Sequence, residues 1–339
     1  MTLSPNIIFA ACLAYVVLLF AVAFWGDRRQ SEGGLLGSPL VYTLSLSVYC
    51  TSWTFFGAVG SAARNGMEFA AIYLGPTLML IGWYTILRKM VRIRQTQQIT
   101  SIADMISSRY GKSPGLAALV TLIAVISTLP YIALQLKAVA ASLDLILRPQ
   151  GAVLDPVSYD ASLYQTAFWV AAGMAGFTIL FGTRTLDANE RHHGVVAAIA
   201  LEALVKLGAL IAVGLFAVFW VLDGPANVLD ALPDRLARED ALFDSRWTAL
   251  TALSAIAVLC LPRMFQVLVV ECSNERHLRT ASWLFPLYLL LMSLFIVPIA
   301  VAGMQTLPSA ADPDFFVITL PLSTDQRWLA LLVFLGGFS

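Results

Sequence analysis

A run of hydroxyl-bearing residues inside an apolar segment is the part of the sequence best suited to bind a small polar solute or a cation. Residues 44–60 read LSLSVYCTSWTFFGAVG, with hydroxyls at Ser45, Ser47, Thr51, Ser52 and Thr54. Gly57 and Gly60 predict points where the backbone leaves helical geometry. Carbonyls freed in this way at membrane depth are tolerated where they line a cavity, and hard cations take oxygen ligands of this kind. A helix whose small residues only pack closely explains the segment equally well.

A second interruption is predicted near the inner end of residues 247–270. Pro262 removes a backbone donor there, and Arg263 places a charge at a costly depth. Discontinuous helices at matching positions of two repeats indicate a transporter's midplane binding site, although a simple proline kink would also fit. The Arg263 guanidinium could hold a substrate carboxylate or line the cytosolic exit.

Few other ionisable residues fall within apolar runs. Glu202 and Lys206 lie four residues apart, which predicts a structural ion pair in preference to a substrate role. Lys137 follows Gln135 in a long run, where its side chain either faces a water-filled vestibule or extends toward the membrane surface. We treat Gln135 and Lys137 as candidate substrate contacts. The spacing of the chain's His, Cys, Asp and Glu residues predicts neither a catalytic constellation nor a metal site.

The elements that must position these residues are membrane-spanning helices. The 339 residues are 59% hydrophobic and only 12% charged, which is typical of an all-α integral membrane protein, and a span needs about 20 apolar residues. Charges balance at 21 of each sign, so nothing favours nucleic acid as a partner. We predict one domain over residues 1–339, with spans at about 6–25, 40–61, 67–87, 115–147, 163–181, 194–222, 247–270, 281–303 and an incomplete one at 327–339.

Loop charges predict the orientation. The loops on one side of these spans hold twice as many Lys and Arg residues as the loops on the other side, which predicts that the amino terminus lies outside the cell membrane. Residues 99–111 predict an amphipathic helix along the inner surface, with Thr100 or Ser101 as its N-cap.

Several segments together carry a resemblance to a known family. They are VYCTSWTFFGAVG (48–60), ITSIADMISSRYG (99–111), LPYIALQLKAVA (129–140), GTRTLDANERHHG (182–194) and CLPRMFQVLVVECSNERHLRTASWLFPLY (260–288). Because of the order and spacing of these segments, the chain resembles the sodium/solute symporter family over its whole length. More narrowly, it resembles the symporter-type N-terminal domain of CbrA-like membrane sensor histidine kinases.

This resemblance implies a LeuT-like fold of two inverted five-helix repeats preceded by one extra helix and ending after the start of core helix 8. It implies a sodium site at the carbonyls near Ser47 and Cys50 with Thr51 beside them, and Na⁺ as the coupling ion. It also implies that Trp53, Thr54 and Phe55 occupy the substrate-facing break.

The expected function is therefore cation-coupled symport, or sensing, of a small polar solute such as an amino acid, histidine for example. The chain would form the N-terminal part of a sensor histidine kinase, with kinase domains in the same polypeptide and a response regulator as partners in two-component signalling. The alternatives are a stand-alone sodium:solute symporter and a non-transporting receptor domain of a kinase. Residues beyond Ser339 would discriminate among these possibilities.

Overall fold

The computed structural model describes residues 4–28, 37–147, 156–177, 193–233, 236 and 243–338, and these form helices without any strand. The α-helices are α1 (Pro5–Arg28), α2 (Pro39–Ser45), α3 (Ser52–Asn65), α4 (Ala70–Ile81), α5 (Leu87–Gln97), α6 (Ile102–Ser108), α7 (Pro114–Leu147), α8 (Pro156–Phe177), α9 (His193–Phe216), α10 (Pro225–Asp230), α12 (Ser245–Cys260), α13 (Pro262–Phe265), α14 (Arg276–Leu294), α15 (Ile296–Thr306), α16 (Phe316–Ser323) and α17 (Arg327–Phe338). Short 3₁₀ segments are η2 (Leu46–Tyr49), η3 (Gly66–Phe69) and η7 (Pro313–Phe315), and π-helical turns are η5 (Ala217–Val221) and η6 (Gln266–Val270).

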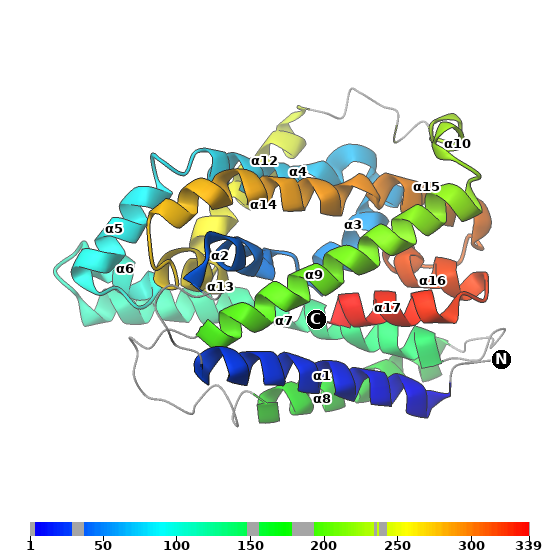
Figure 1. The fold of residues 1–339 in the computed structure, drawn as a ribbon, viewed down its shortest axis with the longest axis horizontal. Coiled ribbons are helices and arrows are strands. Elements are labelled where there is room, and N and C mark those ends of the chain that lie inside the picture. The colour runs from blue at the N-terminus through cyan, green and yellow to red at the C-terminus, as the bar shows by residue number, and fades with distance from the viewer. Residues whose placement is uncertain are drawn as a thin grey trace.

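The long helices run side by side along the longest axis of the molecule (Figure 1). Within the described residues, four stretches are long and apolar enough to cross a membrane: Pro5–Gly26, Pro114–Leu147, Gly194–Val221 and Arg276–Thr306. The bent pair α12 and α13–η6 makes a fifth if it is counted as one span. The protein is therefore an all-α protein with helices of membrane-spanning length.

Other predicted spans are divided in the structure. The prediction at 40–61 corresponds to α2, η2 and α3, and the one at 67–87 to η3 and the 12-residue α4, which ends at a Gly82 cap. For the prediction at 163–181, α8 covers the part up to Phe177, and residues 178–181 lie outside the described residues. The run predicted at 327–339 begins α17 at Arg327.

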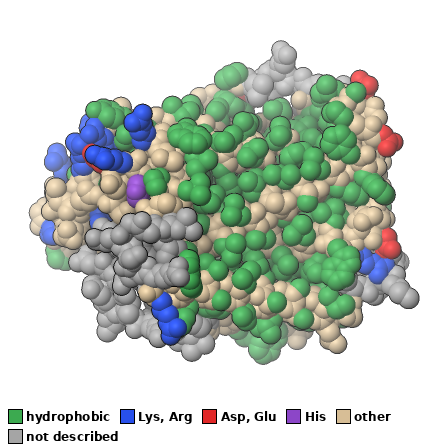
Figure 2. All heavy atoms as spheres, viewed as in Figure 1, with side chains coloured by type: hydrophobic (Ala, Val, Ile, Leu, Met, Phe, Trp, Pro, Cys, Tyr) green, Lys and Arg blue, Asp and Glu red, His purple; other side chains and the backbone are tan. Residues whose placement is uncertain are grey.

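Charged side chains concentrate at the two ends of this helix bundle. Figure 2 shows apolar side chains over most of one face, with Lys and Arg gathered at the end where α5 and α6 lie in Figure 1. Helix α5 supplies Arg88, Lys89, Arg92 and Arg94 to that end. The predicted helix at 99–111 is α6, and its N-cap is Ser101, whose side chain accepts a hydrogen bond from the backbone of Asp104 at 3.1 Å.

Packing among the helices fixes the two interrupted ones. Helix α4 packs against α12 and α14, and Ser254 on α12 donates a hydrogen bond of 2.8 Å to the Ala71 carbonyl on α4. Helix α9 packs against α1, α2 and α17. The Tyr42 hydroxyl on α2 donates to the Leu268 carbonyl of η6 at 2.8 Å, so the two interrupted helices are in direct contact.

Candidate functional site

The first interruption lies at Cys50 and Thr51. Segment η2 ends at Tyr49, the backbone is extended at Cys50 (φ −83°, ψ 92°) and Thr51 (φ −90°, ψ −179°), and α3 begins at Ser52. The carbonyl of Cys50 therefore leaves the helical hydrogen-bond ladder and is available to another donor.

The prediction that Gly57 and Gly60 break the helix is wrong, because both lie inside α3. An extended conformation is open to every L-residue, so the break needs no glycine. The two glycines instead allow close approach. A Cβ at Gly57 would lie 2.9 Å from the Trp53 indole nitrogen, and one at Gly60 would overlap the carboxylate of Asp314 in η7.

The second interruption lies where the sequence predicts it. Helix α12 ends at Cys260, Leu261 is extended (ψ 125°), and α13 begins with Pro262 as its first residue. The two helices meet at 57°. Proline suits this first position because its missing N–H would have no helical partner there.

Side chains of α7 join the two interruptions. The Tyr131 hydroxyl donates to the Thr51 hydroxyl oxygen at 2.8 Å, and the Gln135 carbonyl oxygen accepts from the backbone N–H of Trp53 at 3.0 Å. The Arg263 guanidinium lies 4.4 Å from the centre of the Tyr131 ring. These five residues form what we call the central cluster.

Two donors of the central cluster have no acceptor. The Gln135 amide nitrogen and the Nε of Arg263 are both inaccessible to solvent, and neither has a hydrogen-bond partner in the described part of the chain. Because an unpaired buried donor costs about 1–3 kcal/mol, such groups in a native protein are commonly satisfied by water or by a ligand. The cluster therefore has the chemistry to bind a small molecule that carries acceptor oxygens.

The Cys50 carbonyl, one of the predicted sodium ligands, is occupied by a side chain. Lys206 on α9 is 2% exposed, and its ammonium group donates to this carbonyl at 2.5 Å and to Glu202 at 3.2 Å. The predicted ion pair between Glu202 and Lys206 is thus present, with a backbone carbonyl as its third member. The Thr51 hydroxyl likewise accepts from Tyr131, so two of the predicted sodium ligands each carry a hydrogen bond from a side chain.

The remaining predicted site residues take no part in the contacts that define the central cluster. Ser47 is buried close to the Tyr288 hydroxyl. Thr54 is buried, with its carbonyl accepting from Tyr73, and Phe55 packs edge-on against Phe56. Lys137 is exposed, and its spacing of two residues from Gln135 puts it on a different face of α7.

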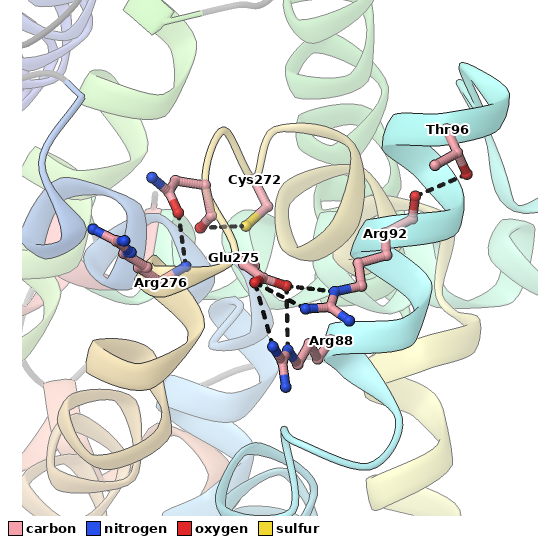
Figure 3. Close-up of polar contacts among 7 residues, drawn as sticks. Arg88, Arg92, Thr96, Cys272, Glu275 and Arg276 are labelled. Carbon is pink, nitrogen blue, oxygen red and sulfur yellow. Dashed lines mark hydrogen bonds and ion pairs between the residues drawn. The ribbon is translucent and has the colours of Figure 1, made fainter.

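An ion-pair cluster at the basic end links α5 to the segment after the second interrupted helix (Figure 3). Glu275, just before α14, accepts from Arg92 at 2.7 and 3.1 Å and from Arg88 at 3.2 and 3.5 Å. These hydrogen bonds lower the pKa of Glu275 to about 2. The cluster thus connects two segments far apart in the sequence.

A second ion pair links α3 to η7. Arg64, in the last turn of α3, bonds to Asp314 and lies 3.5 Å from Asp312. In Figure 1, α5 and α16, the helix that follows η7, lie toward opposite ends of the molecule, so the two ion-pair sites involve elements toward different ends.

Sequence reasoning missed several of these residues. Tyr131 had a local signal, because it lies one turn before Gln135 on the same face of a helix. Glu275 and Arg64 lay among other loop charges, and nothing local distinguished them, because their partners are 183 and 250 residues away.

Comparison with known proteins gives two similar ones, both from Bacillus subtilis (strain 168). The uncharacterized symporter YhjB is 23% identical over 343 residues, covering 97% of this chain and 66% of the relative. The uncharacterized symporter YodF is 30% identical over 125 residues, covering 37% of this chain and 24% of the relative. The chain therefore spans just under two thirds of one relative's length and about a quarter of the other's. No family model matches the chain. Both similar proteins are named as symporters, and this chain has apolar helices of membrane-spanning length.

Proposed function

We propose that this chain binds a small polar solute between its two interrupted helices and either transports it by alternating access or reports its presence. The observation that carries the proposal is the central cluster, in which α7 joins both interruptions and holds two buried donors without acceptors. A purely structural bundle gains nothing from leaving such donors unpaired. The proposal agrees with the similarity to two symporters.

The donors define the solute's chemistry. The Arg263 Nε and the Gln135 amide nitrogen both need acceptor oxygens. A carboxylate provides two such oxygens and a charge that opposes the guanidinium. Amino acids, with histidine as the first to test, are the class that combines a carboxylate with a small polar body.

Alternating access is the mechanism we propose for transport, within a LeuT-like arrangement of inverted repeats. The α5–Glu275 cluster would close one path to the central cluster, and the Arg64–Asp314 pair would close the other. The Arg64–Asp314 pair joins the end of α3 to η7. The α5–Glu275 cluster joins α5 to the segment just before α14. Breaking one ion-pair site while the other remains would expose the solute to one side at a time.

The orientation is part of the same proposal. Helix α1 begins at the end of the bundle opposite to α5 (Figure 1), and basic residues favour the cytoplasmic side. We therefore place the amino terminus outside the inner membrane and the α5–Glu275 cluster on the cytoplasmic side.

Signalling through kinase domains in the same polypeptide rests on the resemblance of residues 182–194 and 260–288 to CbrA-like proteins. The first of these segments lies largely outside the described residues. A solute that binds one helix arrangement more tightly than another would shift the populations by its differential affinity. Autophosphorylation of the full-length protein with and without solute tests this part of the proposal.

Direct binding tests the function. Purified full-length protein in nanodiscs is titrated with a panel of radiolabelled amino acids and small carboxylates, and we expect saturable binding of at least one. Arg263→Gln should weaken that binding about 10- to 100-fold, since hydrogen bonds to charged groups contribute about 1.5–3 kcal/mol. Arg109→Gln, at the exposed C-cap residue of α6, should have no effect. The proposal fails if no compound binds or accumulates in proteoliposomes, or if Arg263→Gln binds like the wild type.

A further inference from the structure

We infer that the ammonium group of Lys206 takes the place of a sodium ion at the first interrupted helix, so that this site neither holds nor requires sodium. The inference deepens the proposed function. It rests on that proposal only in treating the first interruption, at Cys50 and Thr51, as part of the binding site. The contact between Lys206 and Cys50 stands independently of the solute.

The first observation is geometric. The Cys50 carbonyl is freed because Cys50 and Thr51 are extended, and a cation could satisfy it. The Lys206 ammonium reaches it at 2.5 Å across 156 residues of sequence, from a helix that packs against η2. An ammonium group is itself a compact monovalent cation, and it carries three donors.

The second observation is burial. Lys206 is 2% exposed, whereas its partner Glu202 is 26% exposed on the preceding turn of α9. A lysine that only formed an ion pair with Glu202 could do so at the more exposed position of the carboxylate. Instead the side chain extends inward to the interruption, which is where it meets the backbone oxygen.

The third argument is electrostatic. A sodium ion on the Cys50 carbonyl would lie beside a fixed positive charge. At an effective dielectric constant of ~20, two unit charges about 4 Å apart would weaken ion binding by up to roughly a thousandfold, and the Glu202 carboxylate 3.2 Å from the same ammonium offsets part of this repulsion. The other charged or titratable groups around Cys50 are Glu202 on α9, Tyr288 on α14, Arg263 on α13, Tyr49 on η2 and Tyr73 on α4. Arg263 adds a second positive charge, which opposes sodium further.

Radioactive sodium is the direct probe, and it needs no knowledge of the solute. In purified full-length protein we expect no saturable ²²Na⁺ binding that depends on Thr51, and the same thermal midpoint in sodium chloride as in choline chloride. Saturable sodium binding that Thr51→Val abolishes would overturn the inference. A failed solute screen leaves this result unaffected, so the two proposals can fail separately.

A rescue experiment tests whether the Lys206 ammonium group stabilises the first interruption. Lys206→Ala removes the equivalent of propylammonium, and we expect a lower thermal midpoint that millimolar propylammonium raises again while neutral propanol does not. Lys89→Ala, at an exposed lysine on α5, should show neither the loss nor the rescue. If Lys206→Ala is as stable as the wild type, or is rescued equally by propanol, the ammonium does not hold the interruption. If this variant does not fold, the sodium measurement on the wild type still decides.

Discussion

Gly60→Ala should open the path on the η7 side of the central cluster. A Cβ at Gly60 would overlap the Asp314 carboxylate and lie 2.8 Å from the Asp314 Cα. Because the Cα belongs to the backbone, rotating the side chain cannot relieve the overlap, and η7 must move away from α3. Overpacking of this kind costs about 1–3 kcal/mol, and losing the half-exposed Arg64 pair adds about 0–1 kcal/mol. Alanine's higher helix propensity, about 1 kcal/mol, stabilises α3 equally in the open and closed arrangements, so the closed arrangement should lose about 1–4 kcal/mol relative to the open one.

The native thiol of Cys50 can report this change, since it lies in the interruption and is 1% exposed. With the other cysteines replaced by serine, a membrane-impermeant thiol reagent added from the η7 side should react about 5- to 700-fold faster in Gly60→Ala. Gly208→Ala is the matched control, because a Cβ there meets nothing within 4 Å. Equal rates in the two variants would refute the reasoning. So would full additivity with Asp314→Ala in a double-mutant cycle, since directly contacting residues should couple.

Three further outcomes follow from the geometry. Tyr131→Phe should lower stability by about 1 kcal/mol in thermal denaturation because Thr51 loses its donor; an unchanged midpoint would contradict the hydrogen bond. Glu275→Gln should remove a pH-dependent stabilisation: its folded pKa of about 2 lies below the ordinary 4.5, so the contribution is complete above about pH 4.5 and disappears as the pH falls toward 2. Wild type and variant should therefore differ in thermal midpoint at pH 6 and converge near pH 2, and parallel curves would count against this reading. Ser101→Ala should cost about 1 kcal/mol by removing the bond from Asp104, seen as about fivefold faster amide exchange in α6 but not in α5.

Local signals predicted the second interruption better than the first. Pro262 removes a donor wherever it stands, so the position of that break follows from one residue. At the first interruption glycines pointed to the wrong place, because the extended backbone at Cys50 and Thr51 needs no special residue. The glycines serve a contact with Asp314, which comes 254 residues after Gly60 in the chain and leaves no local trace.

The same reasoning explains the outcome for Lys206. Its spacing from Glu202 predicts an i,i+4 ion pair, and that pair is present at 3.2 Å. The bond to the Cys50 carbonyl depends on how α9 packs against η2, which no periodicity in either segment encodes. Sequence patterns therefore identified the residues of the site more readily than their partners.

The π-helical turn η6 gives the second interrupted helix an unusual mechanical property. Its amide at Glu271 bonds back to the Gln266 carbonyl at 2.9 Å, five residues earlier, so the turn stores one residue more than an ordinary α-turn. If the extended residue Leu261 took up that extra residue, α13 would rotate by about 100° relative to the segment that follows η6. Such a screw-like rotation would swing Arg263 off the Tyr131 ring, and a small change in winding would then release whatever the guanidinium held.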